Sequence, residues 1–94
     1  MRRTTQHWLS AVTTVLLATA SHHGQADFET GLSAYRTQAY GEAFDDWQRC
    51  ANENVAACQY AVGVLHDEGR SVEPDIYAAL RWYERSARQA YPDA

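Results

Sequence analysis

The stretch YGEAFDDWQRCA, residues 40–51, has a near copy thirty-six residues later, IYAALRWYERSA, residues 76–87. In both stretches the matching apolar residues stand at relative positions 0, 3, 4, 7 and 11, which is the spacing of one face of an α-helix. The two copies therefore predict an internal repeat built on helices. The matched residues are Tyr40, Ala43, Phe44, Trp47 and Ala51 in the first copy, and Ile76, Ala79, Leu80, Tyr83 and Ala87 in the second.

A further helical segment precedes each copy, at residues 27–37 and at residues 56–67. Gly69 follows the second of these segments, where a left-handed residue often ends a helix, and Pro74 stands where the last helix would begin, with Asp75 in its first turn. Strand patterns are absent. We therefore predict an all-α fold, a short α/α solenoid of about two helical hairpins spanning residues 27–94.

The first 26 residues have the layout of a secretory signal peptide. Arg2 and Arg3 precede an uncharged stretch of thirteen residues, Trp8 to Ala20, which small residues follow. A membrane-spanning helix needs about 20 apolar residues, so we expect no stable membrane insertion once this leader is removed. The small residues permit cleavage after Ala20 or after Ala26, and the mature chain would be periplasmic or secreted.

The charge balance bears on the class of partner. Removing the leader takes away two of the eight arginines and none of the twelve acidic residues, so the net charge changes from −4 to −6. The chain has no lysine, and its remaining arginines are interleaved with Asp and Glu, so it lacks a basic track for a phosphate backbone. We therefore do not expect nucleic acid as a partner. The remaining 68 residues are few for a single core without a staple or a partner.

Residues 56–94 resemble a Sel-one-like repeat, a tetratricopeptide-like helical hairpin with a longer inner loop. Residues 28–51 resemble the degenerate first unit that often follows the signal peptide in exported members. Asn54 and Ala90 stand where these repeats usually have a helix-ending glycine, and Ser71 replaces the second loop glycine. The residues on marked positions of the repeat are Cys58, Val62, Gly63, His66, Gly69, Ser71, Val72, Asp75, Ala79, Trp82, Tyr83, Ser86 and Ala87.

The resemblance also bears on the two cysteines. Cysteine-rich members of this family pair cysteines at the spacing of Cys50 and Cys58, across the turn between hairpins, so the resemblance implies a disulfide here. Export would place the pair in an oxidising compartment, where such a bond persists. The alternatives are a zinc site, which needs about four ligands, and a thioredoxin-like redox pair, which has two intervening residues instead of seven.

We expect neither a metal nor a cofactor in the mature chain. One conditional exception depends on processing, because cleavage after Ala20 would place Ser21, His22 and His23 at a new N-terminus. A free amine, two backbone amides and an imidazole in the third position can form a square-planar site for Cu(II) or Ni(II).

An exported hydrolase is the alternative function, because some cysteine-rich relatives in the resembled family bind or hydrolyse β-lactams. The sequence offers little chemistry for it: a Ser-x-x-Lys nucleophile is impossible without lysine, and no G-x-S-x-G occurs. We interpret His66 as a core histidine bonded to backbone or to a carboxylate. The acidic pairs Asp45-Asp46 and Asp67-Glu68 are interpreted as solvated side chains, so we predict no catalytic residue.

The main prediction is a non-enzymatic module that binds or scaffolds a protein or peptide. Stacked helical hairpins expose a concave surface lined by the first helix of each hairpin. If Gly31 and Gly63 mark equivalent positions, Phe28 and Leu32 belong to this surface but serve mainly as core. The candidate partner-binding residues are Tyr35, Tyr60, Val64 and Asp67.

The C-terminal edge of the repeat is predicted to be uncovered. Residues 89–94 align with residues 53–58 at the same offset, so the chain stops where a third hairpin would begin. We expect a fragment of a longer array, or a protein that completes its core on a partner or by self-association through the last helix. Two hairpins cannot cover all of the large apolar residues of the last helix, which are Ile76, Leu80, Trp82 and Tyr83.

Overall fold

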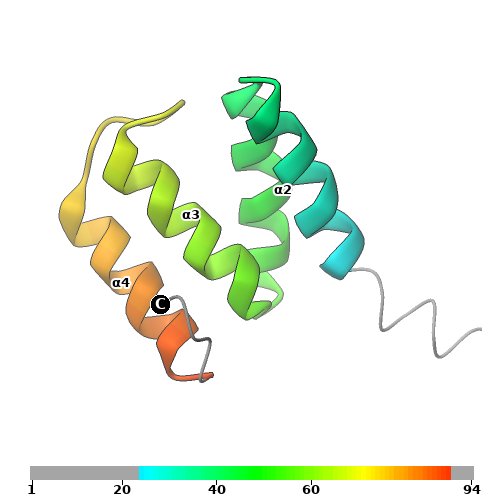
Figure 1. The fold of residues 1–94 in the computed structure, drawn as a ribbon. Coiled ribbons are helices and arrows are strands. Elements are labelled where there is room, and N and C mark those ends of the chain that lie inside the picture. The colour runs from blue at the N-terminus through cyan, green and yellow to red at the C-terminus, as the bar shows by residue number, and fades with distance from the viewer. Residues whose placement is uncertain (1–23, 90–94) are drawn as a thin grey trace, which may run out of the picture.

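A computed structural model describes residues 24–89, and every regular element within this range is a helix (Figure 1). The first described helix covers residues 24–36. It is followed by α2 (Tyr40–Asn52), α3 (Ala56–Glu68) and α4 (Ile76–Ala87). The predicted all-α fold is confirmed, and the expected helix ends differ from the observed ones by a few residues.

The four described helices form two hairpins that lie side by side (Figure 1). The helix 24–36 and α2 form the first hairpin, and α3 and α4 form the second. Helix α3 packs against both α2 and α4, so it joins the two hairpins. None of the helices within residues 24–89 has the length and apolarity needed to span a bilayer.

Two sequence predictions fall outside the described residues. Residues 1–23 contain most of the predicted leader, including the conditional metal site at Ser21, His22 and His23. Ala90, at the expected end of the last helix, is also outside. Residues 24–26, which the predicted leader includes, already belong to the first described helix.

The two short turns of the fold share one backbone geometry. Gln38 and Asn54 both adopt the left-handed conformation, with φ of 66° and 69°. In each turn the next residue donates a hydrogen bond five residues back, from Ala39 N to Ala34 O at 2.8 Å and from Val55 N to Cys50 O at 3.1 Å. Asn54 thus ends its helix as the sequence predicts, since Asn tolerates this conformation at modest cost. The left-handed conformation of Gln38 was not predicted from the sequence.

The longer loop between α3 and α4 uses two left-handed residues. Gly69 ends α3 with φ 68°, as predicted, and Ser71, at the position of the family's second loop glycine, has φ 66°. The start of α4 requires a correction: Pro74 lies before the helix, and Asp75 is its N-cap residue instead of a member of its first turn. The Asp75 carboxylate accepts hydrogen bonds from the backbone N–H groups of Tyr77 and Ala78, at 3.1 and 3.0 Å.

The core is built mainly from small side chains, which let the helices approach closely. Ala43, Ala51 and Ala79 are fully buried, and Val62 and Leu65 of α3 fill the space between helices. A polar network closes the end near the second turn. There the buried Gln59 donates to Ala51 O at 3.3 Å and accepts from Gln89 at 2.9 Å.

The apolar residues of α4 are covered only in part, as the sequence predicts. Ile76 and Leu80 are exposed, at 51% and 48%. Trp82 and Tyr83 are half-buried. Trp82 packs against the core cluster and Tyr83 lies over α3, because α4 turns this side toward its neighbour.

Candidate functional site

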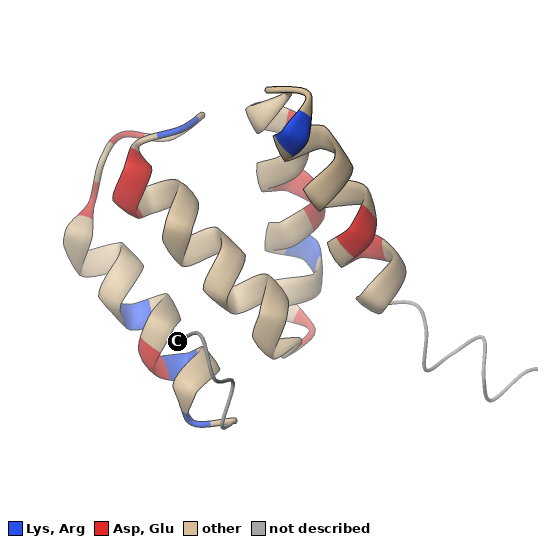
Figure 2. Ribbon diagram, in the orientation of Figure 1, with Lys and Arg blue, Asp and Glu red and all other residues tan. Residues whose placement is uncertain are grey.

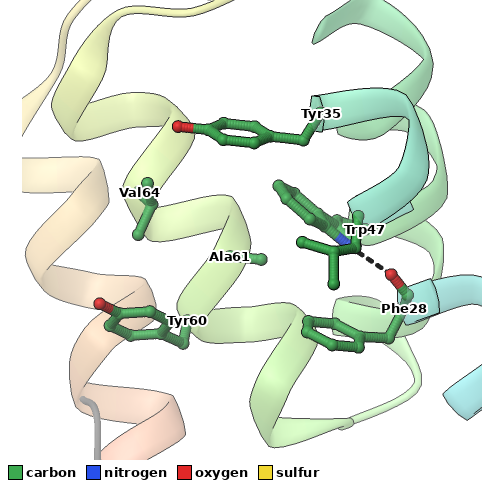
Figure 3. A pocket seen from close by; sticks show the side chains of 7 residues that line it. Phe28, Tyr35, Trp47, Tyr60, Ala61 and Val64 are labelled. Atoms are coloured by element: carbon green, nitrogen blue, oxygen red, sulfur yellow. Dashed lines mark hydrogen bonds between the residues drawn. The ribbon is translucent and has the colours of Figure 1, made fainter. Parts of the chain in front are cut away.

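An apolar groove lies between the helix 24–36 and α3, with α2 beneath it (Figure 3). Its volume is about 350 Å³, at the lower end of the range for ligand pockets. The rings of Tyr35, Phe28 and Tyr60 surround it, and Trp47 and Ala61 lie deeper (Figure 3). The lining residues are Phe28, Leu32, Tyr35, Trp47, Tyr60, Ala61 and Val64.

Trp47 forms a rigid base for the groove. Its side chain is 4% exposed, and its indole Nε1–H donates a hydrogen bond to Phe28 O at 3.0 Å. The Phe28 ring stacks on it at 6.1 Å between centroids, and the Tyr35 ring meets it at 5.7 Å. Because its N–H group and its ring both have partners, the Trp47 ring is held in place where it borders the groove.

Glycine makes room for this ring. A Cβ atom on Gly31 would lie 2.4 Å from Trp47 Nε1, so any larger residue would push the indole away. Gly63 has the same relation to the second hairpin, where a Cβ atom would lie 2.6 Å from Tyr83 Cε1. The two glycines therefore occupy equivalent positions, as the sequence analysis assumed, and each seats one aromatic ring from the second helix of its hairpin.

Tyr35 links the two hairpins at one end of the groove. Its hydroxyl donates a hydrogen bond to Glu68 Oε1 at 2.7 Å, and Arg70 Nε lies 3.3 Å from the same oxygen. Arg70 also donates to the Tyr40 hydroxyl at 2.6 Å and stacks over the Tyr40 ring at 4.6 Å. The hydrogen bond to Glu68, together with burial and the Glu68 charge, raises the pKa of Tyr35.

Tyr60 and Tyr83 form the corresponding aromatic pair of the second hairpin, with ring centroids 5.4 Å apart. The Tyr83 hydroxyl donates to Asp67 Oδ2 at 3.4 Å. Burial and the charge of Asp67 raise the pKa of Tyr83 to about 12. Asp67 thus interacts with α4, and it is not among the residues that line the groove.

The structure brings three of the four candidate partner-binding residues together. Tyr35, Tyr60 and Val64 line one groove, whereas Asp67 lies outside it. Trp47 was identified from the sequence only as an apolar position of the repeat, and Ala61 was not singled out. A buried residue gives no pattern that separates a groove floor from a core position, so the spacing alone could not identify either one.

The two cysteines form a disulfide across the second turn. Cys50 and Cys58 have Cα atoms 5.8 Å apart, and both residues are fully buried. This bond ties α2 to α3 and so joins the two hairpins. Closing this short loop is worth about 2–4 kcal/mol in a chain-entropy description.

The residues considered for catalysis lie apart from the groove. The His66 ring packs edge-to-face on Phe44 at 5.9 Å, and its buried Nδ1 has no hydrogen-bond partner within the described residues, so the predicted bond is not found at this atom. Asp45 is exposed, and Asp46 forms an ion pair with Arg49 at 3.3 Å. Residues 24–89 contain no group of three or more His, Cys, Asp or Glu placed to hold a metal ion.

Charge is distributed unevenly around these features. Residues 24–75 carry ten acidic residues and three arginines. Arg81 lies midway along α4, Arg85 lies in its last turn, and Arg88 is its C-cap residue. Figure 2 shows basic residues from the middle of α4 to its end. Residues 24–75, which include every residue that lines the groove, are therefore acidic overall. Half of the six arginines in the described residues belong to the α4 segment.

Residues 56–91, which contain α3, the long loop and α4, match the family model described as Sel1 repeat. Residues 56–91 form a Sel1 repeat. The Sel1 repeat is thus the second hairpin of the fold, and the family resemblance predicted from the sequence is confirmed. Proteins with this repeat typically engage other proteins.

The chain is also similar to a curated protein, chitin synthase regulatory factor 3 from Schizosaccharomyces pombe (strain 972 / ATCC 24843). The two are 35% identical over an alignment of 83 residues, which covers 80% of this chain and 9% of the relative. The similarity is longer than the Sel1 repeat itself, so it extends into the first hairpin. No solved structure matches the chain.

Proposed function

We propose that this chain is a non-enzymatic binding module that holds a segment of a protein or peptide in the groove between the helix 24–36 and α3. The groove carries this proposal, because it offers several aromatic and aliphatic side chains to one ligand while its floor is held by Trp47. Rigid aromatic surfaces of this kind bind with little loss of side-chain entropy. The proposed ligand places one or two bulky apolar side chains there.

The charge around the groove refines the proposal. Ten acidic residues against three arginines in residues 24–75 favour a ligand with lysine or arginine beside its apolar anchor. Such complementarity raises the association rate and selects among partners more than it raises affinity. We therefore propose a basic peptide segment with a bulky apolar anchor.

The proposed place of action is outside the cytoplasm, in the periplasm or the secreted fraction. Two features support it: the leader-like first 26 residues, and a disulfide that an oxidising compartment would preserve. Expression of the full chain with a C-terminal tag, followed by fractionation and mass spectrometry of the mature N-terminus, tests this. Recovery of an uncleaved, reduced chain in the cytoplasm would contradict it.

The binding proposal is tested with two labelled nonapeptides that share a central Leu-x-x-Phe anchor, one flanked by lysines and the other by glutamates. We expect the lysine peptide to bind the mature protein more tightly, by about tenfold or more, and to lose affinity as salt increases. Fluorescence anisotropy measures both peptides. Equal or absent binding of the two peptides would contradict the proposed ligand.

A matched pair of variants locates the binding site. Val64→Glu places a charge inside the groove and should abolish binding of the lysine peptide, because the carboxylate would be buried against the apolar anchor. Leu80→Glu adds the same charge to an exposed apolar residue of α4 and should leave binding unchanged. Circular dichroism confirms that both variants are folded. Binding that survives Val64→Glu would place the ligand elsewhere.

A further inference from the structure

The large exposed apolar side chains of residues 24–89 gather on one helix. Ile76, Tyr77 and Leu80 are 51%, 73% and 48% exposed, and all three lie in the first half of α4. We call these three residues the α4 edge. The groove lies between the helix 24–36 and α3 and includes none of them, so the α4 edge is a separate surface.

The first hairpin shows that this edge is a contact position of the repeat. Ile76 and Leu80 stand thirty-six residues after Tyr40 and Phe44 of α2. In α2 both positions are covered by the following hairpin: Arg70 stacks over the Tyr40 ring at 4.6 Å, and the His66 ring meets Phe44 at 5.9 Å. On α4 no described helix takes that place, so the edge retains an unfilled packing surface.

The opposite end of the molecule does not complement this edge. Helix α3 covers α2 with Cys58, Val62 and Leu65, which are all fully buried. The equivalent positions of the helix 24–36 lie thirty-two residues earlier, which is the offset between Gly31 and Gly63. The side chains at these positions are small, exposed and largely polar. These equivalent residues are Ala26, Thr30 and Ser33. Head-to-tail stacking of two copies would therefore bury hydroxyl groups against the α4 edge.

We propose that the α4 edge is a self-association surface, on which a second copy of this chain docks its own α4 antiparallel about a two-fold axis near Leu80. A two-fold interface needs one self-complementary patch, and the apolar edge provides it. The charges agree with the antiparallel orientation. Glu73 and Asp75 before α4 would face Arg85 and Arg88 at the end of the partner helix, and all four residues are exposed. Within its own chain Arg88 lies 3.9 Å from Glu84, and Arg85 stacks over the Trp82 ring, so the contacts across the dimer would add to these. Antiparallel helices also oppose their dipoles favourably.

The interface would be small, because three apolar residues and the flanking charges of one helix contribute to it. Interfaces below the standard size are typical of weak or transient association. We therefore expect a dimer that forms between roughly 10 μM and 1 mM protein. Sedimentation velocity on the mature protein across this range should show one concentration-dependent monomer–dimer equilibrium.

Two glutamate substitutions identify the surface. Leu80→Glu should weaken dimerisation by about tenfold or more, because two carboxylates would meet at the axis. Ser33→Glu, on the polar outer face of the helix 24–36, should leave dimerisation unchanged, and it would disrupt a head-to-tail arrangement. Both positions are exposed, so the monomers should stay folded by circular dichroism.

A charge exchange tests the orientation. Glu73→Arg alone and Arg88→Glu alone each place like charges opposite one another in an antiparallel homodimer, so each variant should dimerise more weakly than the unaltered chain. Mixed in equal amounts, the two variants restore both opposite-charge pairs. We therefore expect the mixture to recover dimerisation, and the recovery should diminish with added salt.

Each measurement can overturn the proposal. A chain that remains monomeric at 1 mM, a dimer unaffected by Leu80→Glu, or a dimer lost with Ser33→Glu would each rule out the two-fold α4 interface. Failure of the mixed variants to recover association would rule out the antiparallel orientation. None of these results depends on the groove, because Val64→Glu should leave self-association intact.

Discussion

The first hairpin, helix 24–36 with α2, and the second hairpin, α3 with α4, follow one pattern but differ in how completely each is covered. Each seats an aromatic ring of its second helix over a glycine of its first, Trp47 over Gly31 and Tyr83 over Gly63. Yet Trp47 is 4% exposed, while Tyr83 is half-buried. The two equivalent residues therefore differ in burial, because Trp47 belongs to a core cluster that includes residues of α3 in the next hairpin, and Tyr83 does not belong to it.

The two hairpins also differ in the length of the connection between their helices. The first uses a three-residue turn, residues 37–39, and the second a seven-residue loop, residues 69–75. Helix α2 is then fastened to α3 by the Cys50–Cys58 disulfide. Beyond α4, the described residues contain no corresponding link to a further helix. The first hairpin behaves as an interior unit on its α2 side, whereas the second has an open edge.

The largest predicted effect compares the two aromatic rings. Trp47→Ala should lower the free energy of unfolding by about 3–5 kcal/mol, the cost of emptying a large buried site. The loss for Tyr83→Ala should be smaller than the loss for Trp47→Ala by about 1–2 kcal/mol, because water already reaches part of the Tyr83 ring. Urea unfolding followed by circular dichroism, with the disulfide intact, measures both. Equal losses would show that coverage by the neighbouring hairpin does not set the difference.

The disulfide should have the next largest effect. Replacing both cysteines, Cys50→Ala with Cys58→Ala, should lower the free energy of unfolding by about 2–4 kcal/mol, because the short loop of the unfolded chain is released. The same urea titration measures this loss, and the reduced unaltered protein is the control. If the double variant matched the oxidised protein in stability, the bond would be dispensable for joining the hairpins.

The N-cap of α4 should contribute about 1 kcal/mol to the free energy of unfolding. Asp75→Ala removes the acceptor for the N–H groups of Tyr77 and Ala78, whereas α2 and α3 begin without a side-chain cap. Asp45→Ala, on the exposed face of α2, is the matched control and should change stability by less than about 0.5 kcal/mol. Similar effects of the two substitutions would show that the longer loop does not make the second hairpin depend on its cap.

The smallest effect concerns that loop itself. Ser71 adopts φ 66°, which is unfavourable for a residue with a Cβ atom, so Ser71→Gly should stabilise the protein by about 0.5–1 kcal/mol. Gly69→Ala, two residues earlier at φ 68°, should destabilise it, because a Cβ atom there would lie 2.5 Å from Pro74 Cγ. Thermal unfolding of the three proteins gives the comparison. Destabilisation by Ser71→Gly would show that the hydroxyl has a contact that outweighs the backbone strain.

Much of the fold could be predicted because its signals are local. The apolar spacing in residues 40–51 and 76–87 is sufficient to place two helices and the repeat between them. The roles of Gly69 and Asn54 follow from backbone sterics, which depend on residue type more than on surroundings. The left-handed conformation of Gln38 could not be predicted, because glutamine has no strong preference for this conformation. Only the tertiary packing of the first hairpin imposes this conformation on Gln38.

The candidate site was predictable only in part. Tyr35, Tyr60 and Val64 could be placed on one surface because the repeat offset relates their helices. Asp67 was included by the same offset, but its carboxylate accepts a hydrogen bond from Tyr83 and does not line the groove. The offset gives the position of a residue on its helix. It does not determine which neighbour its side chain will contact.

Four properties follow from the amino-acid sequence: the helices, their pairing into hairpins, the family of the second hairpin and the acidic character of the chain. These properties depend on spacing, residue type and charge, which need no knowledge of distant contacts. The packing of the helices, in contrast, makes Trp47 a groove floor, turns Trp82 and Tyr83 inward, and leaves Ile76, Tyr77 and Leu80 exposed. The reason is that burial is a property of neighbours: the same apolar position is core where the next hairpin covers it and surface where none does.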